Sequence, residues 1–399
     1  MKFFPESALQ QLEYEKVKTL LAGYCKTEFA KDRAANLRIH TKKEFIELEL
    51  KQTHEYKIIV QSGLYFPNDF ILNLSKELKL IAIPGAVLSG EQFLQIRQLA
   101  ENTGSIFRWF DNERRITYPA LTTVIENTYF EKNITILIDE ILDESGNVKD
   151  KASETLSAIR MNLYRKRNEL RRVFDRMITK LNKLGYLADI EESFINGRRV
   201  LAGFAEQKRM IKGILHGESD SRRTTFIEPE ETTGLNNDIF SLENEERKEI
   251  YKILRQLTHN VGAYAPLLKT YHDIAGNFDF INAKAKWAIV LGGNYPQVHD
   301  KAHIHLIQAY HPLLLVYNKT NNKPTIPINL SLNDKSRILV ISGPNAGGKT
   351  VTLKTVGLLQ LMLQSGLLVP VHPDSEMGIF KQIMIHIGDT QSLEFELST

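Results

Sequence analysis

The chain has 399 residues, of which 42% are hydrophobic and 25% are charged, and its formal net charge is +3. This composition is ordinary for a soluble protein of roughly two or three domains. The single cysteine, Cys25, excludes an internal disulfide bond. The N-terminus lacks the apolar core of a signal peptide, and no apolar run approaches membrane-spanning length. We therefore expect a cytoplasmic protein.

The first hundred residues show helical periodicity. Leu12, Val17 and Leu21 fall at helical spacing, and Gly23 stands near the expected stop. A later apolar run ends in Asp139-Glu140 and resembles the strand that handles Mg²⁺ and water in ATPases. It lies upstream of the phosphate-binding motif described below, however, and continues into a typical helix end and turn. We therefore expect no catalytic role for it.

Residues 153–184 predict a long helix with a coiled-coil-like seam. Apolar residues recur there every seven positions, at Leu156, Leu163, Leu170, Met177 and Leu184. The other faces are rich in basic residues: Arg160, Arg165, Lys166, Arg167, Arg171, Arg172, Arg176, Lys180 and Lys183. A solvated helix surface explains any one of them. Their clustering also fits contact with a polyanion, and both interpretations stay open.

Residues 186–234 read as a small β-module inserted between long helices. Residues 194–202 predict two strands about an Asn196-Gly197 turn, and residues 210–216 and 222–227 predict further strands. We expect nucleic-acid contacts from the basic residues of this module: Arg198, Arg199, Lys208, Arg209, Arg222 and Arg223. Residues 235–257 then return as a helix.

A last helical segment, residues 273–288, precedes a boundary at residues 292–296. Residues 304–306 and 313–316 predict edge strands that lead to a third strand at residues 338–341.

The motif G-x-x-x-x-G-K-[ST] follows that third predicted strand. It is Gly343-Pro344-Asn345-Ala346-Gly347-Gly348-Lys349-Thr350, and an apolar helical pattern begins at Val351. Glycines allow backbone N–H groups to approach phosphate oxygens, and the helix N-terminus favours an anion. We expect Lys349 to reach the β- and γ-phosphates of ATP and Thr350 to bind Mg²⁺.

Several separated segments together resemble the MutS family of ATPases. They are the phosphate loop, His311-Pro312-Leu313, and the closing residues 387–392 and 397–399. Residues 12–17 and 226–237 resemble the second bacterial branch of that family, which lacks the mismatch-reading domain and is of the recombination-suppressing or ribosome-rescue type. The resemblance covers essentially the whole chain.

The resemblance implies a homodimer that joins through its ATPase domains, with lever helices ending in clamp modules that close around a nucleic acid. ATP and Mg²⁺ would bind at residues 343–351. Lys349 and Ser398 would be catalytic residues, and Ser398 would act on the nucleotide of the opposite subunit. The segment around His311 would lie near the nucleotide.

The implied fold is multidomain and mostly α-helical, with a clamp β-module and an α/β P-loop ATPase domain of ABC type. We expect a helical core and outgoing arm (1–185), the clamp module (186–234), returning helices (235–292) and the ATPase domain (293–399). Ala346 replaces the usual Thr. The Asp-Glu strand, the catalytic His and the nuclease-like domain that the family places downstream are absent. We therefore expect a truncated ATPase domain that binds ATP but hydrolyses it poorly.

The expected function is an ATP-dependent clamp on branched or mismatched DNA that restrains recombination. A clamp that recognises stalled or collided ribosomes through rRNA is an alternative, because rRNA presents the same phosphate chemistry. A third possibility is an arm and dimerisation scaffold without hydrolysis. We do not favour a small-molecule kinase built on the phosphate loop, because the long helical arms and the clamp would then have no role.

Overall fold

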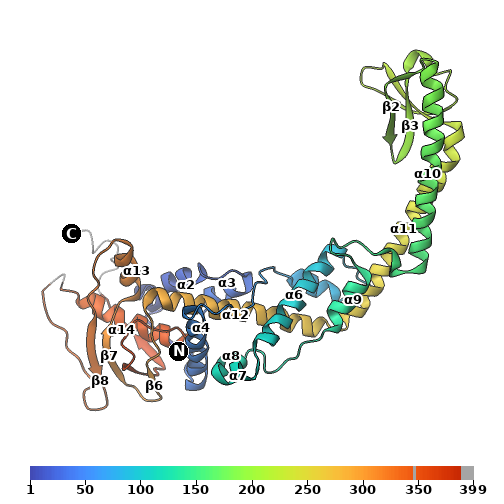
Figure 1. Ribbon diagram of the computed structural model, residues 1–399. Helices are drawn as coiled ribbons and strands as arrows, with labels where there is room; N and C mark the ends of the chain where they lie inside the picture. Colours follow the sequence, from blue (N-terminus) through green and yellow to red (C-terminus); the bar gives the residue numbers. More distant parts are fainter. Residues whose placement is uncertain (345–346, 388–399) are drawn as a thin grey trace. The chain divides into compact units, whose positions relative to one another are not determined.

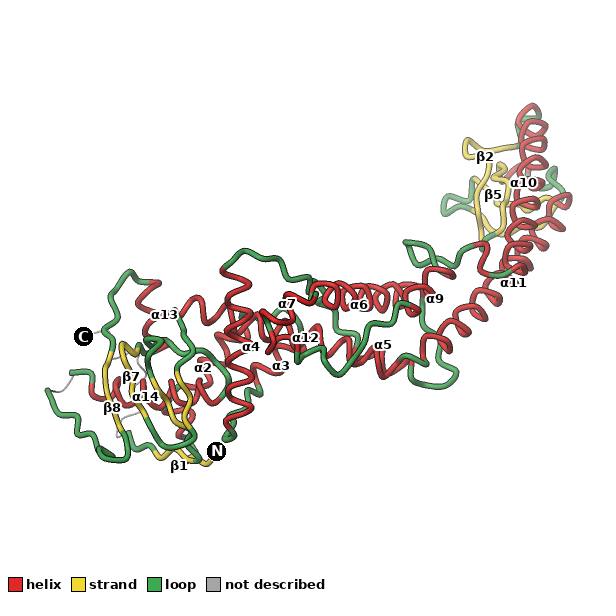
Figure 2. The backbone as a smooth tube through the Cα atoms, turned by 60° about the horizontal axis from the view of Figure 1, so that its bottom comes forward, coloured by secondary structure: helices red, strands yellow, loops and turns green. Residues whose placement is uncertain are grey.

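The computed structural model describes residues 1–344 and 347–387. Its backbone divides into two compact units. Unit 1 comprises Met1–Lys76, Gln95–Lys132 and the chain from Pro266 onward, and unit 2 comprises Glu77–Leu94 and Asn133–Ala265. The strands gather in one region of each unit (Figure 2). The four-part domain division made from the sequence stays a prediction.

The N-terminal part of unit 1 is helical, as its periodicity predicted. Its elements are β1 (Lys2–Phe4), α1 (Ala8–Gln11), α2 (Tyr14–Ala22), α3 (Glu28–Ala35), α4 (Lys43–Gln61), α7 (Asn112–Thr117) and α8 (Pro119–Thr122). Three helices contribute residues to both units: α5 (Ser75–Ile81), α6 (Gly90–Trp109) and α12 (Ala265–Leu291).

The C-terminal part of unit 1 combines a four-stranded mixed sheet with helices (Figure 1). Its elements are β6 (Gln297–His299), β7 (Ile304–Ala309), α13 (Pro312–Thr320), β8 (Ile328–Leu332), α14 (Lys349–Gln364), β9 (Glu376–Gly378) and β10 (Gln382–Met384). The strand order is β6-β9-β7-β8, and β10 pairs in parallel with β1 in a separate two-stranded sheet.

The N-terminal helices pack against α14 in one hydrophobic core. The Tyr14 hydroxyl lies 2.5 Å from the Ser365 hydroxyl, and both groups are buried. Gly357 of α14 lies against Leu12, so closely that a Cβ at position 357 would be 2.7 Å from a Leu12 methyl carbon. The first residues of the chain therefore support the helix that follows the phosphate-loop motif. Sequence periodicity did not predict this contact between segments about 350 residues apart.

Unit 2 contains two long helices joined by a four-stranded antiparallel sheet, called the inserted sheet below. The elements are α9 (Asn133–Ile141), a 3-10 turn (Asp150–Ala152), α10 (Glu154–Lys183), β2 (Leu187–Ile195), β3 (Arg198–Phe204), a second 3-10 turn (Ala205–Gln207), β4 (Gly213–Glu218), β5 (Thr224–Pro229) and α11 (Glu230–Gly262). The strand order is β2-β3-β5-β4. The helical assignment of Asp139-Glu140 agrees with their rejection as a catalytic strand.

Local sequence signals account for the boundaries of α10 and of the first hairpin. The Ser153 hydroxyl accepts a hydrogen bond from the Leu156 amide and caps α10. Asn196 and Gly197 both have positive φ angles, 52° and 79°, which suit the predicted two-residue turn between β2 and β3. The predicted seam is buried at its first three positions, whereas Leu184 is exposed. The seam packs against α11 and the inserted sheet.

Two predicted strands are wrong. Residues 313–316 belong to α13, because Pro312 occupies the first turn and His311 caps the helix through Nδ1. Residues 338–341 form no strand, and the side chains of Ile338 and Val340 are 85% and 83% exposed. A β-branched run becomes a strand only by pairing, and no strand of the described chain pairs with this one.

Among the helices that the structure describes, none is both long and apolar enough to cross a bilayer.

Candidate nucleotide and nucleic-acid sites

The phosphate-loop motif leads directly into α14, as predicted. Gly348 precedes the helix with a left-handed φ of 80°, which glycine adopts without strain, and α14 begins at Lys349. The Lys349 ammonium donates hydrogen bonds to the carbonyl oxygens of Gly343 and Pro344, each at 2.6 Å. The predicted lysine therefore folds back across the start of its own loop.

The start of α14 and Lys349 are suited to binding a phosphate group. The first N–H groups of a helix have no intrahelical acceptors and favour an anion. Two neutral carbonyls hold Lys349, and phosphate oxygens are stronger acceptors for an ammonium because they are charged. Thr350 and Val351 are half-buried in the first turn, whereas Gly347 is exposed. Asn345 and Ala346 lie outside the described residues, as does Ser398.

One lysine of α14 is buried and pairs with a carboxylate of the N-terminal segment. Lys354 is buried and lies 3.5 Å from a carboxylate oxygen of Glu13 in the turn before α2. His311, also buried, is held neutral because burial, with help from the Lys354 charge, lowers its pKa to about 4. His311 therefore acts here as the cap of α13. Nothing in the sequence around Glu13 signals its pairing with Lys354.

Two of the basic residues predicted to contact nucleic acid are occupied within the inserted sheet. The Arg198 guanidinium contacts the carboxylate of Glu228 at 2.7 and 3.0 Å. Arg199 forms an ion pair with Glu192 at 2.6 Å and lies over the ring of Phe174. Both arginines therefore stabilise the inserted sheet, and Arg199 also connects the sheet with α10.

Glu228 is the centre of this network and is fully buried. It accepts hydrogen bonds from Arg198 and from Asn236 Nδ2 at 2.9 Å, and His216 Nε2 lies 2.6 Å away. Burial raises the pKa of Glu228, but these hydrogen bonds outweigh burial and hold the pKa below its usual range. Glu228 and its partner Asn236 belong to the segment 226–237, which carried part of the family resemblance. This segment connects β5 with α11.

The other predicted contacts lie on loops of the same sheet. Lys208 pairs with Glu218 at 3.2 Å. Arg209, Arg222 and Arg223 are exposed and form no ion pair within the described chain. These three side chains are free to meet an external anion.

The basic residues of α10 divide into two groups. Arg160, Lys166 and Arg167 pair with acidic residues of α11, at 2.7–2.8 Å. A second group is exposed and makes no ion pair with any described residue: Arg165, Arg171, Arg172, Arg176, Lys180 and Lys183.

Four members of the second group form a continuous row, called the basic stripe below. They are Arg165, Arg172, Arg176 and Lys183. Their spacing of seven, four and seven residues places them on one side of the helix. They span about 27 Å of its length. The stripe reflects both a helical period and the absence of acidic partners, and only the first of these could be read from the sequence.

Comparison with known proteins places the chain in a family. No family model matches it. It is 32% identical to the endonuclease MutS2 of Aquifex aeolicus over 394 residues, which are 99% of this chain and 50% of that protein. The endonucleases MutS2 of Latilactobacillus sakei and Finegoldia magna are 33% and 31% identical over 98% and 99% of the chain, each covered to 49%. The chain belongs to the MutS2 family.

The resemblance inferred from the sequence motifs is therefore confirmed at the level of the family. The chain spans about half the length of the curated MutS2 relatives that it matches. The match covers nearly the whole chain, including unit 2 with its inserted sheet as well as the phosphate-loop motif.

Proposed function

We propose that this MutS2-family protein is an ATP-dependent clamp that binds the phosphate backbone of branched or mismatched DNA and restrains recombination. In this proposal the chain binds ATP and Mg²⁺ at residues 343–351, with Mg²⁺ on Thr350, and pairs with a second copy through its ATPase domains. Ser398 would complete the nucleotide site of the opposite subunit. Unit 2 would supply the arm and the clamp.

The basic stripe on α10 is the observation that carries the proposal. Its four cations have no acidic partner among the described residues, so their attraction to an external polyanion is not cancelled within the molecule. Each phosphate contact releases condensed counterions, which makes affinity fall steeply with salt. Arg209, Arg222 and Arg223 add three more unpaired cations in the same unit. Such a surface suits backbone contact and not base reading.

The nucleotide part of the proposal rests on the start of α14. Lys349 already lies beside the loop that would hold the phosphates, and its two carbonyl contacts can be exchanged for phosphate oxygens. Because α2 and the turn before it pack on α14, a shift of α14 on phosphate binding would also move the N-terminal helices. ATP hydrolysis by the complete protein is part of the proposal.

A second candidate is a clamp that recognises stalled or collided ribosomes. The observation that favours it is that the unpaired cations suit contact with phosphate groups and show no pattern for recognising bases. The phosphate backbone of rRNA would therefore bind them as well as that of DNA.

A competition experiment tests the proposal and separates the two candidates. A labelled four-way DNA junction is bound to the chain at physiological salt with a non-hydrolysable ATP analogue, and collided or single ribosomes are then titrated in. A junction that resists both supports the DNA clamp, and preferential displacement by collided ribosomes supports the second candidate. Replacement of all four stripe residues by Gln should lower the salt slope by about 3 to 4. An unchanged slope would overturn the role of the stripe.

A further inference from the structure

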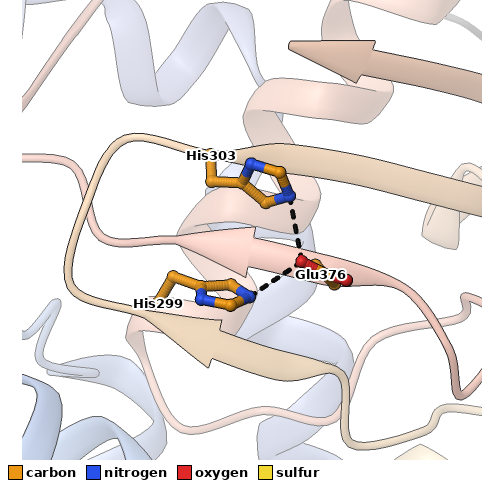
Figure 3. Close-up of side chains that lie close together, drawn as sticks. All are labelled: His299, His303 and Glu376. Atoms are coloured by element: carbon orange, nitrogen blue, oxygen red, sulfur yellow. Dashed lines mark ion pairs between the residues drawn. The ribbon is translucent and has the colours of Figure 1, made fainter. Parts of the chain in front are cut away.

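Three side chains in unit 1 converge on one another at one end of the mixed sheet. His299 is the last residue of β6, His303 immediately precedes β7, and Glu376 is the first residue of β9. Strand β9 lies between β6 and β7 in the sheet. Figure 3 shows both imidazole rings pointing toward the carboxylate between them. His299 and His303 lie close together in the sequence, but no sequence signal connects either of them with Glu376, which belongs to a distant segment.

The distances within this trio match the spacing of ligands around one small ion. His299 Nε2 lies 2.9 Å and His303 Nε2 lies 3.1 Å from the same carboxylate oxygen, Oε2 of Glu376. One donor atom from each residue falls within a group no wider than 4.8 Å. Around a tetrahedral zinc ion with bonds of about 2.1 Å, neighbouring ligand atoms are about 3.4 Å apart.

Protein partners do not satisfy the two nitrogen atoms. Both Nε2 atoms are buried, and within the described residues neither has a hydrogen-bond partner of suitable geometry, despite the short distances to Glu376. A buried nitrogen without a partner costs free energy in either protonation state. A metal ion would accept both nitrogen lone pairs and the carboxylate charge at once, which removes this cost.

The backbone holds both histidines in place. The Gly378 amide donates to the carbonyl of His303 at 2.5 Å, and the Ile379 amide donates to the carbonyl of His299 at 3.1 Å. The turn between β6 and β7 crosses directly over Gly378, where a Cβ would lie 2.1 Å from the carbonyl oxygen of Lys301. Only glycine permits this crossing, which brings the two imidazoles to the same carboxylate.

We propose that His299, His303 and Glu376 bind one divalent transition-metal ion of the zinc class. Two imidazoles and a carboxylate suit Zn²⁺, whereas Mg²⁺ and Ca²⁺ prefer oxygen ligands. The trio lines an open hollow together with Asp300, Asp334, Lys43, Lys301 and Lys335, so water can reach an ion bound there as a further ligand. The ion ties the β6–β7 turn to β9 and stabilises this end of the sheet. This inference is independent of the proposed clamp function.

Zinc titration of the metal-free 399-residue chain tests the proposal. Calorimetry is run without nucleotide and with excess Mg²⁺, so that the phosphate loop does not contribute. The expected result is one Zn²⁺ per chain, with affinity reduced at least about tenfold in His299→Gln and in His303→Gln. His305→Gln is the matched control, because His305 pairs in register with Glu376 but lies outside the trio. An equal loss in the control, or no zinc binding by the unaltered chain, would overturn the proposal.

A second measurement needs no variant and so does not depend on the folding of the altered chains. Hydrogen exchange followed by mass spectrometry reports on each segment of the unaltered chain separately. Zn²⁺ should slow amide exchange in the β6–β7 turn and in β9, which the ion ties together, and leave the inserted sheet of unit 2 unchanged. Equal exchange in the β6–β7 turn and β9 with and without Zn²⁺ would contradict the assignment. Co²⁺ should give a visible absorption band typical of low coordination number, and its absence would count equally against the site.

Discussion

Arg198 contacts both carboxylate oxygens of the buried Glu228 through one guanidinium nitrogen, at 2.7 and 3.0 Å. This contact changes the role that the sequence suggested for Arg198. A basic residue beside a hairpin turn in a predicted nucleic-acid clamp is a natural candidate for phosphate binding. The structure instead uses it to neutralise a buried carboxylate, so a loss of binding on its removal would not distinguish contact from misfolding.

The first prediction concerns this ion pair. Arg198→Met should destabilise the inserted sheet by about 3 kcal/mol, because it leaves the Glu228 charge buried without its cation. Hydrogen exchange of the β3 and β5 amides measures the effect as a free energy of local opening. The control is Arg222→Met, since Arg222 is exposed and has no ion pair within the described chain, and its effect should stay within about 0.5 kcal/mol. Equal protection in both variants would contradict the assigned role.

The second prediction concerns the loops of the inserted sheet. Replacing Arg209, Arg222 and Arg223 by Gln should reduce the salt slope of DNA binding by up to about 3 while the inserted sheet remains folded. Fluorescence anisotropy over a range of salt concentrations gives the slope. A variant with Lys51, Lys323 and Lys381 changed to Gln removes the same charge from exposed positions in unit 1. If both triple variants behave alike, the effect is one of net charge and the loops are not the contact.

The third prediction concerns Lys349. Lys349→Met should weaken ATP binding on the order of 100-fold, because charged hydrogen bonds to phosphate oxygens are lost. Calorimetry with Mg²⁺ and a non-hydrolysable analogue measures the affinity. Lys381→Met is the control, because Lys381 is exposed and distant from the motif in the sequence. Unchanged affinity in Lys349→Met would refute the nucleotide site.

The fourth prediction concerns a buried pair in the core of unit 1. Lys284 of α12 is almost completely buried and lies 3.0 Å from Glu49 of α4. Burial raises the pKa of Glu49, but Lys284 and His40 outweigh burial and lower the pKa to about 2. Burial lowers the pKa of Lys284, and Glu49 opposes that change. Glu49→Gln should cost about 3 kcal/mol or more in stability at neutral pH, because Lys284 then keeps a buried charge without a counterion.

The same pair predicts an acid dependence. Because the folded-state pKa of Glu49 lies below the ordinary carboxyl value, its contribution is present above that value and is lost as the pH falls toward 2. Denaturant unfolding between pH 6 and pH 2 should therefore show a shallower loss of stability in Glu49→Gln. The double variant with Lys284→Met should recover most of the neutral-pH stability. Parallel pH profiles for Glu49→Gln and the unaltered chain would contradict the assignment.

Features of the fold that depend on neighbouring residues could be predicted from the sequence. Local backbone preferences and caps explain the start of α10 after Ser153, the turn at Asn196-Gly197 and the start of α14 after Gly348. The two strand errors have one cause. Residues 313–316 and 338–341 are apolar, but apolar character does not specify whether a pairing strand is available or whether a proline has already started a helix.

Features of the site that depend on long-range packing could not be predicted. A sequence shows that Arg198 and Arg222 are both basic, but not that one of them faces Glu228 and the other faces solvent. The pairing of Glu13 with Lys354 and the meeting of His299 with His303 across β9 also require the folded chain. For that reason the sequence identified a phosphate-loop motif and basic segments, but not which of the basic side chains are paired inside the fold.

In the proposed clamp, nucleotide binding controls how tightly the chain holds a nucleic acid. The most direct measurement is the affinity of the chain for a labelled four-way junction at physiological salt, with and without Mg²⁺ and a non-hydrolysable ATP analogue, compared with Lys349→Met. We expect the junction affinity to change at least about fivefold with the analogue in the unaltered chain and not to change in Lys349→Met. A junction affinity that is the same with and without the analogue in the unaltered chain would contradict this proposal.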